Sequence, residues 1–238
     1  MTPKICLVVA VVSAGLLVQV STAAILTVGS PNGVLSVDSA NAGTRTPRPE
    51  LGPDVFQWTG AMTRLNLGWD LSWDLTIDND PSVSGVASFT NTMPGTANFT
   101  LNISSTSTVA IGSPLVNGAS SITVLDTAAD GATMSALTGG SIYDAVIGAT
   151  SIQSLFSDPF SLVAPASQTN ATFQNWGPFT SGTGIGIGQS FGINHFFSLT
   201  SGDQATINSS FFINIPTPGG AVVLSVIGLS IVSRRRRN

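Results

Sequence analysis

Carboxylates and a single histidine are the side chains of this sequence that could do chemistry. The aspartates form two short groups, one at Asp78 and Asp80 and one in the segment DTAADG, which contains Asp126 and Asp130. Carboxylate and turn carbonyl oxygens are the ligands that calcium prefers. Neither group has the Asp-x-Asp-x-Asp-Gly spacing of an EF-hand loop, and aspartate also stabilises turns by itself. Both are therefore candidate calcium sites, with turn formation as the default interpretation and no other cofactor predicted.

His195 is the only histidine of the chain, in the segment GINHFFSLT. It shares the alternating apolar positions with Phe197, which predicts that it points into a core. A hydrolytic triad needs a nucleophile and an acid around the histidine, and no Gly-x-Ser-x-Gly motif is present. We therefore expect a structural histidine, no catalytic residue and no enzyme. A hydrolase that pairs carboxylates from distant strands remains an alternative.

Tryptophans could bind a sugar by stacking against its ring. Trp69 and Trp73 share one strand face with leucines around them, which favours a place in the core. Trp58 and Trp176 lie outside the strongest strand patterns and are the better candidates for exposed aromatic side chains. A carbohydrate-binding module of an exopolysaccharide matrix is therefore an alternative function.

Alternating apolar and polar residues predict strands as the elements that carry these side chains. The clearest pattern is RLNLGWDLSWDLTID, residues 64–78, which we expect to form one continuous strand with its apolar side chains on one face. Residues 82–91 and 97–104 are predicted to form a hairpin around the turn TMPGT. Further strands are predicted at residues 120–125, 192–200 and 204–215, and residues 140–147 are either a strand or a loop segment.

Eight to ten such strands without crossover helices predict an all-β fold, an antiparallel β-sandwich that is jelly-roll-like. The predicted ectodomain covers residues 25–215, and residues 148–184 show only loose patterns. Apolar residues make up 42% of the chain and charged residues only 8%, so serine, threonine, asparagine and glycine supply the polarity.

Charge is divided sharply between the body of the chain and its ends. Between the ends, three arginines stand against twelve acidic residues, a formal charge of −9. Such a body repels phosphates, which excludes a nucleic-acid partner and favours neutral glycans or divalent cations. The only cysteine is Cys6, so the body has neither a disulfide nor a thiol nucleophile.

The N-terminal residues 1–24 have the pattern of a signal peptide that forms a signal helix. Lys4 provides a positive charge, and residues 5–20 are an apolar stretch. Small residues then predict cleavage after Ala23 or Ala24. A retained membrane anchor is the alternative, although the apolar stretch is shorter than the ~20 residues of a comfortable span.

The C-terminal residues 216–238 have three parts. The segment Pro216, Thr217 and Pro218 is stiff and extended, and an apolar run at residues 219–233 predicts a short hydrophobic helix. Arg234, Arg235, Arg236 and Arg237 follow. An arginine cluster holds its end on the cytoplasmic side, and a run this short suits transient rather than permanent membrane insertion.

This layout resembles the PEP-CTERM sorting signal of bacteria, in which a Pro-Glu-Pro-like motif precedes a short helix and an arginine cluster. The resemblance implies export, processing by an exosortase-like membrane enzyme, and an association with exopolysaccharide. Thr217 stands where the family has glutamate, and a plain C-terminal anchor with stop-transfer arginines is the alternative. The same tail is also called an ice-binding protein C-terminal domain, a name that does not imply ice binding.

Together these features predict a non-enzymatic exported protein of the cell surface or extracellular matrix. A temporary anchor in the inner membrane would precede its processing. The ligand of residues 25–215 is not predicted by any motif.

Overall fold

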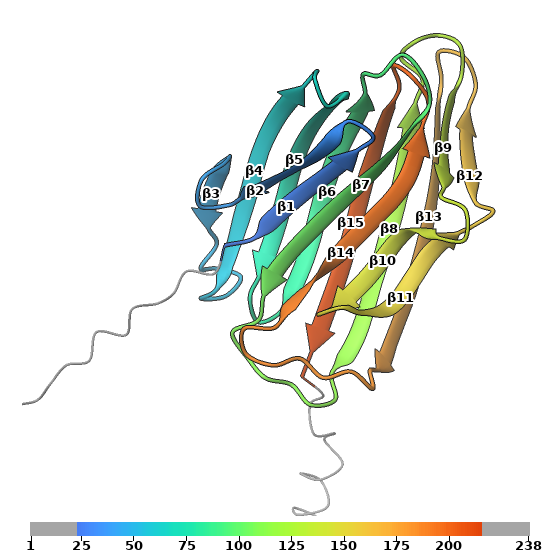
Figure 1. The fold of residues 1–238 in the computed structure, drawn as a ribbon. Coiled ribbons are helices and arrows are strands. Elements are labelled where there is room, and N and C mark those ends of the chain that lie inside the picture. The colour runs from blue at the N-terminus through green and yellow to red at the C-terminus, as the bar shows by residue number, and fades with distance from the viewer. Residues whose placement is uncertain (1–22, 216–238) are drawn as a thin grey trace, which may run out of the picture.

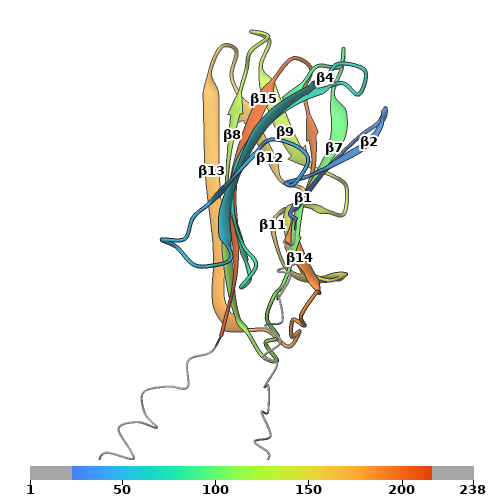
Figure 2. The same ribbon diagram turned by 90° about the vertical axis from the view of Figure 1, so that its left-hand side faces the viewer.

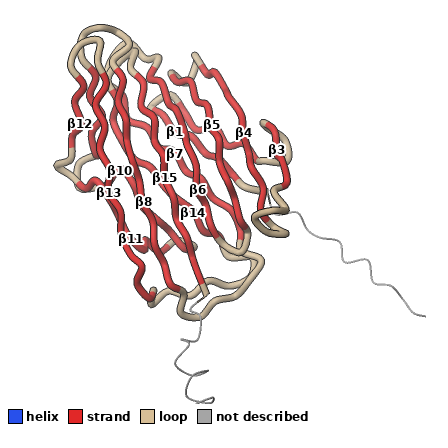
Figure 3. The backbone as a smooth tube through the Cα atoms, turned by 180° about the vertical axis from the view of Figure 1, so that it is seen from behind, coloured by secondary structure: helices blue, strands red, loops and turns tan. Residues whose placement is uncertain are grey.

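A computed structural model describes residues 23–215 as fifteen strands in two antiparallel sheets, without a helix in that range (Figure 3). The eight-stranded sheet has the order β11-β10-β14-β7-β1-β2, and β9 pairs with both β14 and β12. Its strands are β1 (Ile25–Ser30), β2 (Gly33–Asp38), β7 (Ala97–Thr106), β9 (Ala132–Ala136), β10 (Ser141–Ile147), β11 (Thr150–Ser157), β12 (Ser161–Ala164) and β14 (Ser190–Leu199).

The seven-stranded sheet has the order β13-β8-β15-β6-β5-β4-β3. Its strands are β3 (Thr44–Pro47), β4 (Val55–Arg64), β5 (Trp69–Asp78), β6 (Ser82–Asn91), β8 (Leu115–Leu125), β13 (Thr169–Thr180) and β15 (Gln204–Asn214). The two sheets form two facing layers (Figure 2), and the buried apolar side chains form one core cluster. The expected all-β, antiparallel architecture is confirmed. The expected signal helix and C-terminal helix lie outside the described residues.

Strand β5 shows why this sequence folds into sheets. Burial alternates along it, with Trp69, Leu71, Trp73, Leu75 and Ile77 all buried. Side chains of a strand point to opposite faces in turn, so this face enters the core while the aspartates and hydroxyls face outward. The alternation predicted from the sequence is confirmed for this stretch.

The expected strand at residues 64–78 is too long at its beginning. Arg64 ends β4, and the chain then turns at residues 65–68 before β5 begins. Gly68 has a φ of 82°, and its N–H donates to the carbonyl of Arg64. Leu65, which continues the apolar pattern, is 73% exposed at this turn. The sequence pattern did not reveal this tight turn, because apolar residues occupy alternate positions in it as they do in the strand.

The expected hairpin of residues 82–91 and 97–104 is wrong. Both segments are strands, but β6 pairs in the seven-stranded sheet and β7 in the eight-stranded sheet. The connection between them passes from one layer to the other. The Asn91 side chain holds this crossing, because its Nδ2 donates to the carbonyls of Gly95 and Leu199.

Several strands were not predicted. β1 to β3 and most of β4 precede the expected strands, and β11, β12 and all of β13 lie in the stretch whose patterns looked loose. In β13 almost every side chain is exposed. Such a strand has no buried face and therefore carries no apolar alternation.

Both ends of the described chain lie toward the same end of the molecule, in the lower part of Figure 1. Ile25 pairs with Ser104, and the next residue, Ser105, donates to the side chain of Asn79. Asn79 belongs to the turn after β5, where the carbonyl of Pro81 accepts the N–H of Ile213 near the end of β15. The opposite end carries the turns that precede β15 and follow β8.

Candidate functional site

The acidic cluster at the far end of the molecule contains one residue that sequence reasoning missed. Asp126 follows β8, Asp130 lies in the next turn, and Asp203 directly precedes β15. One carboxylate oxygen from each lies within 4.8 Å of the others, the only such acidic group among residues 23–215. The sequence gives little sign that Asp203 belongs to this cluster, because it stands in an ordinary Ser-Gly-Asp turn. Only the pairing of β8 with β15 brings it next to Asp126.

Asp126 is occupied as a hydrogen-bond acceptor. Its Oδ1 accepts the N–H groups of Ala128 and Ala129, and its Oδ2 accepts those of Gly131 and Ser167. A carboxylate has about four acceptor positions. Asp126 therefore ties its own turn to the loop before β13, and few lone pairs remain for a cation.

The other two carboxylates differ in their surroundings. Asp203 is fully buried, and its oxygens accept the N–H of Thr127 and the hydroxyl of Thr200. Asp130 is exposed. For Asp126, burial by itself would raise the pKa, but the N–H groups of Ser167 and Gly131 outweigh it and hold the pKa below its ordinary value. The donors that lower this pKa are protein groups, which favours turn organisation over calcium binding.

The second expected aspartate group is not part of a three-carboxylate cluster in the described chain. Asp78 accepts the N–H of Asp80 within the turn that follows β5. Burial raises the pKa of Asp78, the N–H of Asp80 partly offsets this, and the nearby carboxylates of Asp80 and Asp54 add to the rise. Turn formation explains the contact between these two residues.

His195 lies in the core, as the sequence predicted. Its imidazole is buried on β14, where Nδ1 donates to the carbonyl of Ile142 at 3.2 Å and the ring meets Tyr143 edge-on. Desolvation lowers the pKa of His195 to about 4, because the charged form would lose its water. The residue is neutral at pH 7 and out of contact with solvent, which is the situation of a packing residue.

The tryptophans do not form an exposed platform. Trp69 and Trp73 are buried, as predicted, but Trp58 is fully buried too, which contradicts the expectation of an exposed ring. Its Nε1 donates to the carbonyl of Ala42 at 2.7 Å, and its ring packs edge-on against Trp73. Trp176 is partly buried and packs against Phe211. Sugar stacking on these rings is therefore not supported.

A shallow groove on the outer face of the seven-stranded sheet is lined by polar side chains that the strand register places next to one another. Thr63, Asp70, Thr90 and Gln204 lie side by side on β4, β5, β6 and β15. The groove has a volume of about 170 Å³, and Ser72 and Ser88 extend it. Neighbouring strands are ~4.8 Å apart, so the groove presents a regular grid of hydroxyl, carboxylate and amide groups.

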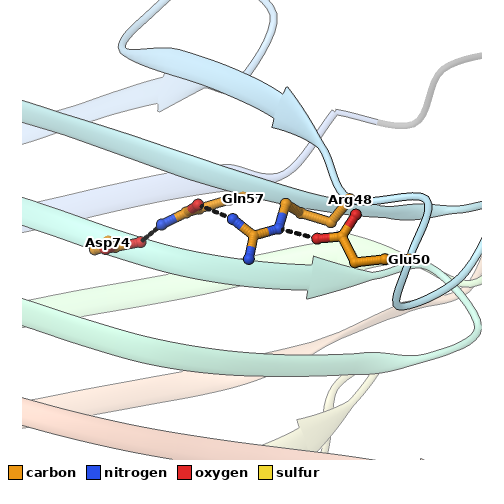
Figure 4. A network of polar contacts seen from close by, with 4 residues as sticks. All are labelled: Arg48, Glu50, Gln57 and Asp74. Atoms are coloured by element: carbon orange, nitrogen blue, oxygen red, sulfur yellow. Dashed lines mark hydrogen bonds and ion pairs between the residues drawn. The ribbon is translucent and has the colours of Figure 1, made fainter.

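Asp70 is the unusual member of this groove. Its Oδ1 is buried and has no hydrogen-bond partner within the described residues. A buried acceptor without a partner is costly, so a donor from water or a ligand is expected there. Asp74 lies four residues further along β5 on the same face, and its side chain has hydrogen-bond partners (Figure 4). Its Oδ1 accepts Gln57, whose Oε1 accepts Arg48.

Arg48 completes this second network by an ion pair with Glu50, with Nε and Oε1 2.6 Å apart (Figure 4). Both side chains are well exposed, so the pair contributes little stability by itself. Arg48 reaches Asp74 only through Gln57, so the charge partner of the arginine is Glu50.

Comparison with known proteins adds no family. No protein-family profile matches the chain, and no curated protein matches it. A crystal structure of the Stig cyclase Fisc from Fischerella sp. TAU is similar at a TM-score of 0.30 and 9% identity, over 65% of this chain and 89% of that one. A similarity of this size carries no argument about fold family or activity.

The predicted sorting residues Pro216, Thr217, Pro218 and Arg234 to Arg237 lie outside the described residues. Within the described part, no helix is long and apolar enough to cross a membrane. Of the predicted cleavage residues, Ala24 belongs to the folded body. It is buried, its N–H donates to Ser39 Oγ at 3.0 Å, and its carbonyl accepts the N–H of Ser39.

Proposed function

We propose that this chain is a non-enzymatic exported protein of the cell surface or extracellular matrix, sorted through residues 216–238 by an exosortase-like membrane enzyme. The observation that carries the proposal is the pairing of a signal-like N-terminus with the tail Pro-Thr-Pro, a short apolar run and four arginines. The two-sheet body supports it, because a core of one continuous cluster needs no disulfide.

The position of the two chain ends also supports this proposal. The described body begins and ends toward the same end of the molecule (Figure 1), where the turn after β5 links the start of β1 to the end of β15. Both predicted membrane segments would therefore leave the body on one side. The opposite end, with the turns around Asp126 and Asp203, would point away from the membrane, roughly 30 Å away along strands of ten or eleven residues.

The contacts of Ala24 favour one of the two cleavage points. Cleavage after Ala23 leaves Ala24 in place, with its amine still able to donate to Ser39. Cleavage after Ala24 would remove a buried residue and both backbone contacts with Ser39. We therefore place the cleavage after Ala23.

Mass spectrometry of the exported protein tests the proposal at both ends. The expected species begins at Ala24 and lacks Arg234 to Arg237. Replacing the four arginines by serine is expected to reduce processing and leave the tail attached. Exported material that retains the arginines in full would contradict the sorting proposal, and a mass beginning at Ile25 would contradict the cleavage point.

The jelly-roll-like arrangement belongs to the same proposal. β6 pairs with β15 in one sheet, while the strands nearest to them in sequence, β7 and β14, pair in the other. Nested pairing of this kind is what winding two paired strands around a barrel-like core produces. It supports classing the body as a jelly-roll-like sandwich.

The groove around Asp70 favours a second function, the binding of a neutral saccharide of the matrix. The Asp70 carboxylate lines the groove and can accept a sugar hydroxyl, and the neighbouring hydroxyl and amide groups can serve adjacent ones. The groove is smaller than the ~300–1,000 Å³ of enclosed ligand pockets, so its size suits one ring of a longer chain.

Binding to an array of neutral oligosaccharides tests this second function. Asp70→Asn removes the charged acceptor and is expected to weaken binding about tenfold or more, since it abolishes a charge-assisted hydrogen bond. Asp74→Asn is the matched control, because it makes the same change on the same strand face and keeps an oxygen for Gln57. Equal binding by the two variants would contradict a role for the groove.

A further inference from the structure

Strand β13 is an open edge of the seven-stranded sheet. Its residues, Thr169–Thr180, pair with β8 on one side and with no other strand of the described chain. It is longer than any other described strand, and every side chain except Thr172 and Trp176 is exposed. In Figure 2 it forms the outer margin of its layer. Such an edge presents a row of unpaired N–H and C=O groups.

The hydrogen bonds show which peptide groups point outward. The Gln168 carbonyl, just before β13, accepts the N–H of Asp126 on the β8 side. The N–H of Ala171 instead donates to the side chain of Asn170. Backbone groups alternate between the two sides of a strand, so those of Ala171, Phe173 and Asn175 point away from β8. An incoming strand would meet the outward peptide groups of Phe173 and Asn175, and it would have to displace the Asn170 side chain to reach the N–H of Ala171.

The usual devices that protect a sheet edge are missing from this segment. β3 has four residues and includes Arg45 and Pro47, β2 ends at Asp38, and the pairing of β11 with β10 has a register shift. Short length, charge, proline and irregular register all discourage pairing with another chain. β13 has no charged residue, and Pro178 lies only beyond the register shift after Trp176.

Gln174 and Asn170 close the gap between the two layers without covering this edge. Gln174 Oε1 accepts the N–H of Phe156 on β11, and Asn170 Nδ2 donates to the carbonyl of Val163 on β12. Both residues remain exposed themselves. The two contacts hold β13 in position and so present its outer edge as a fixed template.

The distribution of charge identifies which partner fits. Strands β6, β15, β8 and β13 contain no charged residue, and the outward aspartates of this sheet lie on β5, four strands from the edge. The body has a formal charge of −9 and repels its own copies in most orientations. Contact through β13 keeps the aspartates of β5 in the two copies far apart.

We propose that two copies of this chain pair through β13, antiparallel and around a two-fold axis at Phe173. Phe173 of each copy would lie opposite the other, and Ala171 would lie opposite Asn175, which joins the two seven-stranded sheets into one. Phe173 is 60% exposed in the single chain, so the contact of the two rings would bury apolar surface. The contact is self-complementary, as a two-fold interface must be.

Sedimentation equilibrium of the full chain, kept dispersed in a mild detergent, tests the proposal. Phe173→Lys places two ammonium groups next to each other at the axis and is expected to raise the dimer dissociation constant about tenfold or more. Val86→Lys is the matched control. Val86 is also an exposed apolar residue in the same cross-strand row, three strands further into the sheet. We expect the control to dimerise like the unchanged chain.

Disulfide cross-linking gives a second reading that does not depend on the lysine variant folding. Phe173→Cys, in a chain where Cys6→Ser removes the natural cysteine, is expected to form a cross-linked dimer on mild oxidation, because opposed Cα atoms lie ~5.5 Å apart. Val86→Cys should stay uncross-linked. A monomer throughout the micromolar range, equal dissociation constants for the two lysine variants, or equal cross-linking of the two cysteine variants would each overturn the proposal.

Discussion

Burial of the His195 imidazole makes one residue responsible for part of the pH dependence of stability. The folded-state pKa is lowered to about 4, whereas the unfolded chain keeps the ordinary value of 6.5. Between these values the unfolded state binds a proton that the native state does not, so stability falls as the pH falls through this window. The loss from pH 6.5 to pH 4 amounts to about 3 kcal/mol.

His195→Gln is expected to flatten this window. The variant cannot titrate, so its free energy of unfolding should change less between pH 6.5 and pH 4 than that of the unchanged chain. Denaturant unfolding at several pH values measures the difference, and taking that difference removes the effect of the carboxylates common to both proteins. A constant difference across the window would show that His195 can be protonated in the folded state.

Asp126 is the residue whose removal should disturb the far end most. Asp126→Asn retains one oxygen, yet an amide nitrogen cannot accept the N–H groups of Gly131 and Ser167. We expect a clearly lower melting temperature, and a smaller change for Asp130→Asn at the exposed position. Calcium should not shift the melting temperature of the unchanged chain or of either variant, because backbone N–H groups already occupy the Asp126 carboxylate. A calcium-dependent rise lost in both variants would instead establish a cation site.

At the scale of elements, the close contact of β6 with β5 depends on a glycine. Gly85 has a φ of 144°, a region that other residues rarely adopt. A Cβ there would meet the backbone of β5 directly, at the Asp74 carbonyl oxygen and 2.7 Å from the Cα of Leu75. Backbone atoms of a central strand cannot move aside as a flexible side chain can.

Gly85→Ala should therefore destabilise the protein by about 2 to 4 kcal/mol, the combined effect of backbone strain and overpacking. Gly95→Ala is the matched control, since a Cβ at Gly95 has no heavy atom within 4 Å. Denaturant midpoints at constant slope give both values. Equal stability of the two variants would mean that β5 and β6 can move apart without a measurable loss of folding free energy.

Elements with one buried face could be predicted from the sequence, and elements without one could not. Residues 82–91 and 192–200 were predicted nearly to their bounds, because β6 and β14 bury alternate side chains. β13 buries almost none, so its existence follows only from its pairing with β8. The false hairpin of β6 and β7 has a related cause. Alternation reports which face is buried and does not report which sheet a strand joins.

The candidate sites were predictable only where they are local in sequence. Asp126 and Asp130 belong to one turn and were recognised together, but Asp203 comes from the neighbouring strand pair. The Asp70 groove takes its members from four strands. Their proximity is a product of strand register, and nothing in the four segments taken singly indicates it.

At the scale of the whole molecule, the shared position of the two chain ends gives the body a direction. Asp80 lies in the turn beside Asn79, next to the contacts that bring Ile25 and Ile213 to one end. Asp130 lies in the turns at the other end, and both side chains are exposed. If membrane segments leave the body at the first end, the membrane shields Asp80 and leaves Asp130 open.

Cysteine labelling on intact cells distinguishes the two ends. In a chain carrying Cys6→Ser and the arginine-to-serine tail that stays attached, Asp130→Cys is expected to react with a bulky maleimide about tenfold faster than Asp80→Cys, because a bilayer tens of ångströms thick obstructs only the near end. The purified chain provides the reference, where both cysteines should react at similar rates. Equal rates on cells would show that the body does not stand on the membrane by the end where its two termini meet.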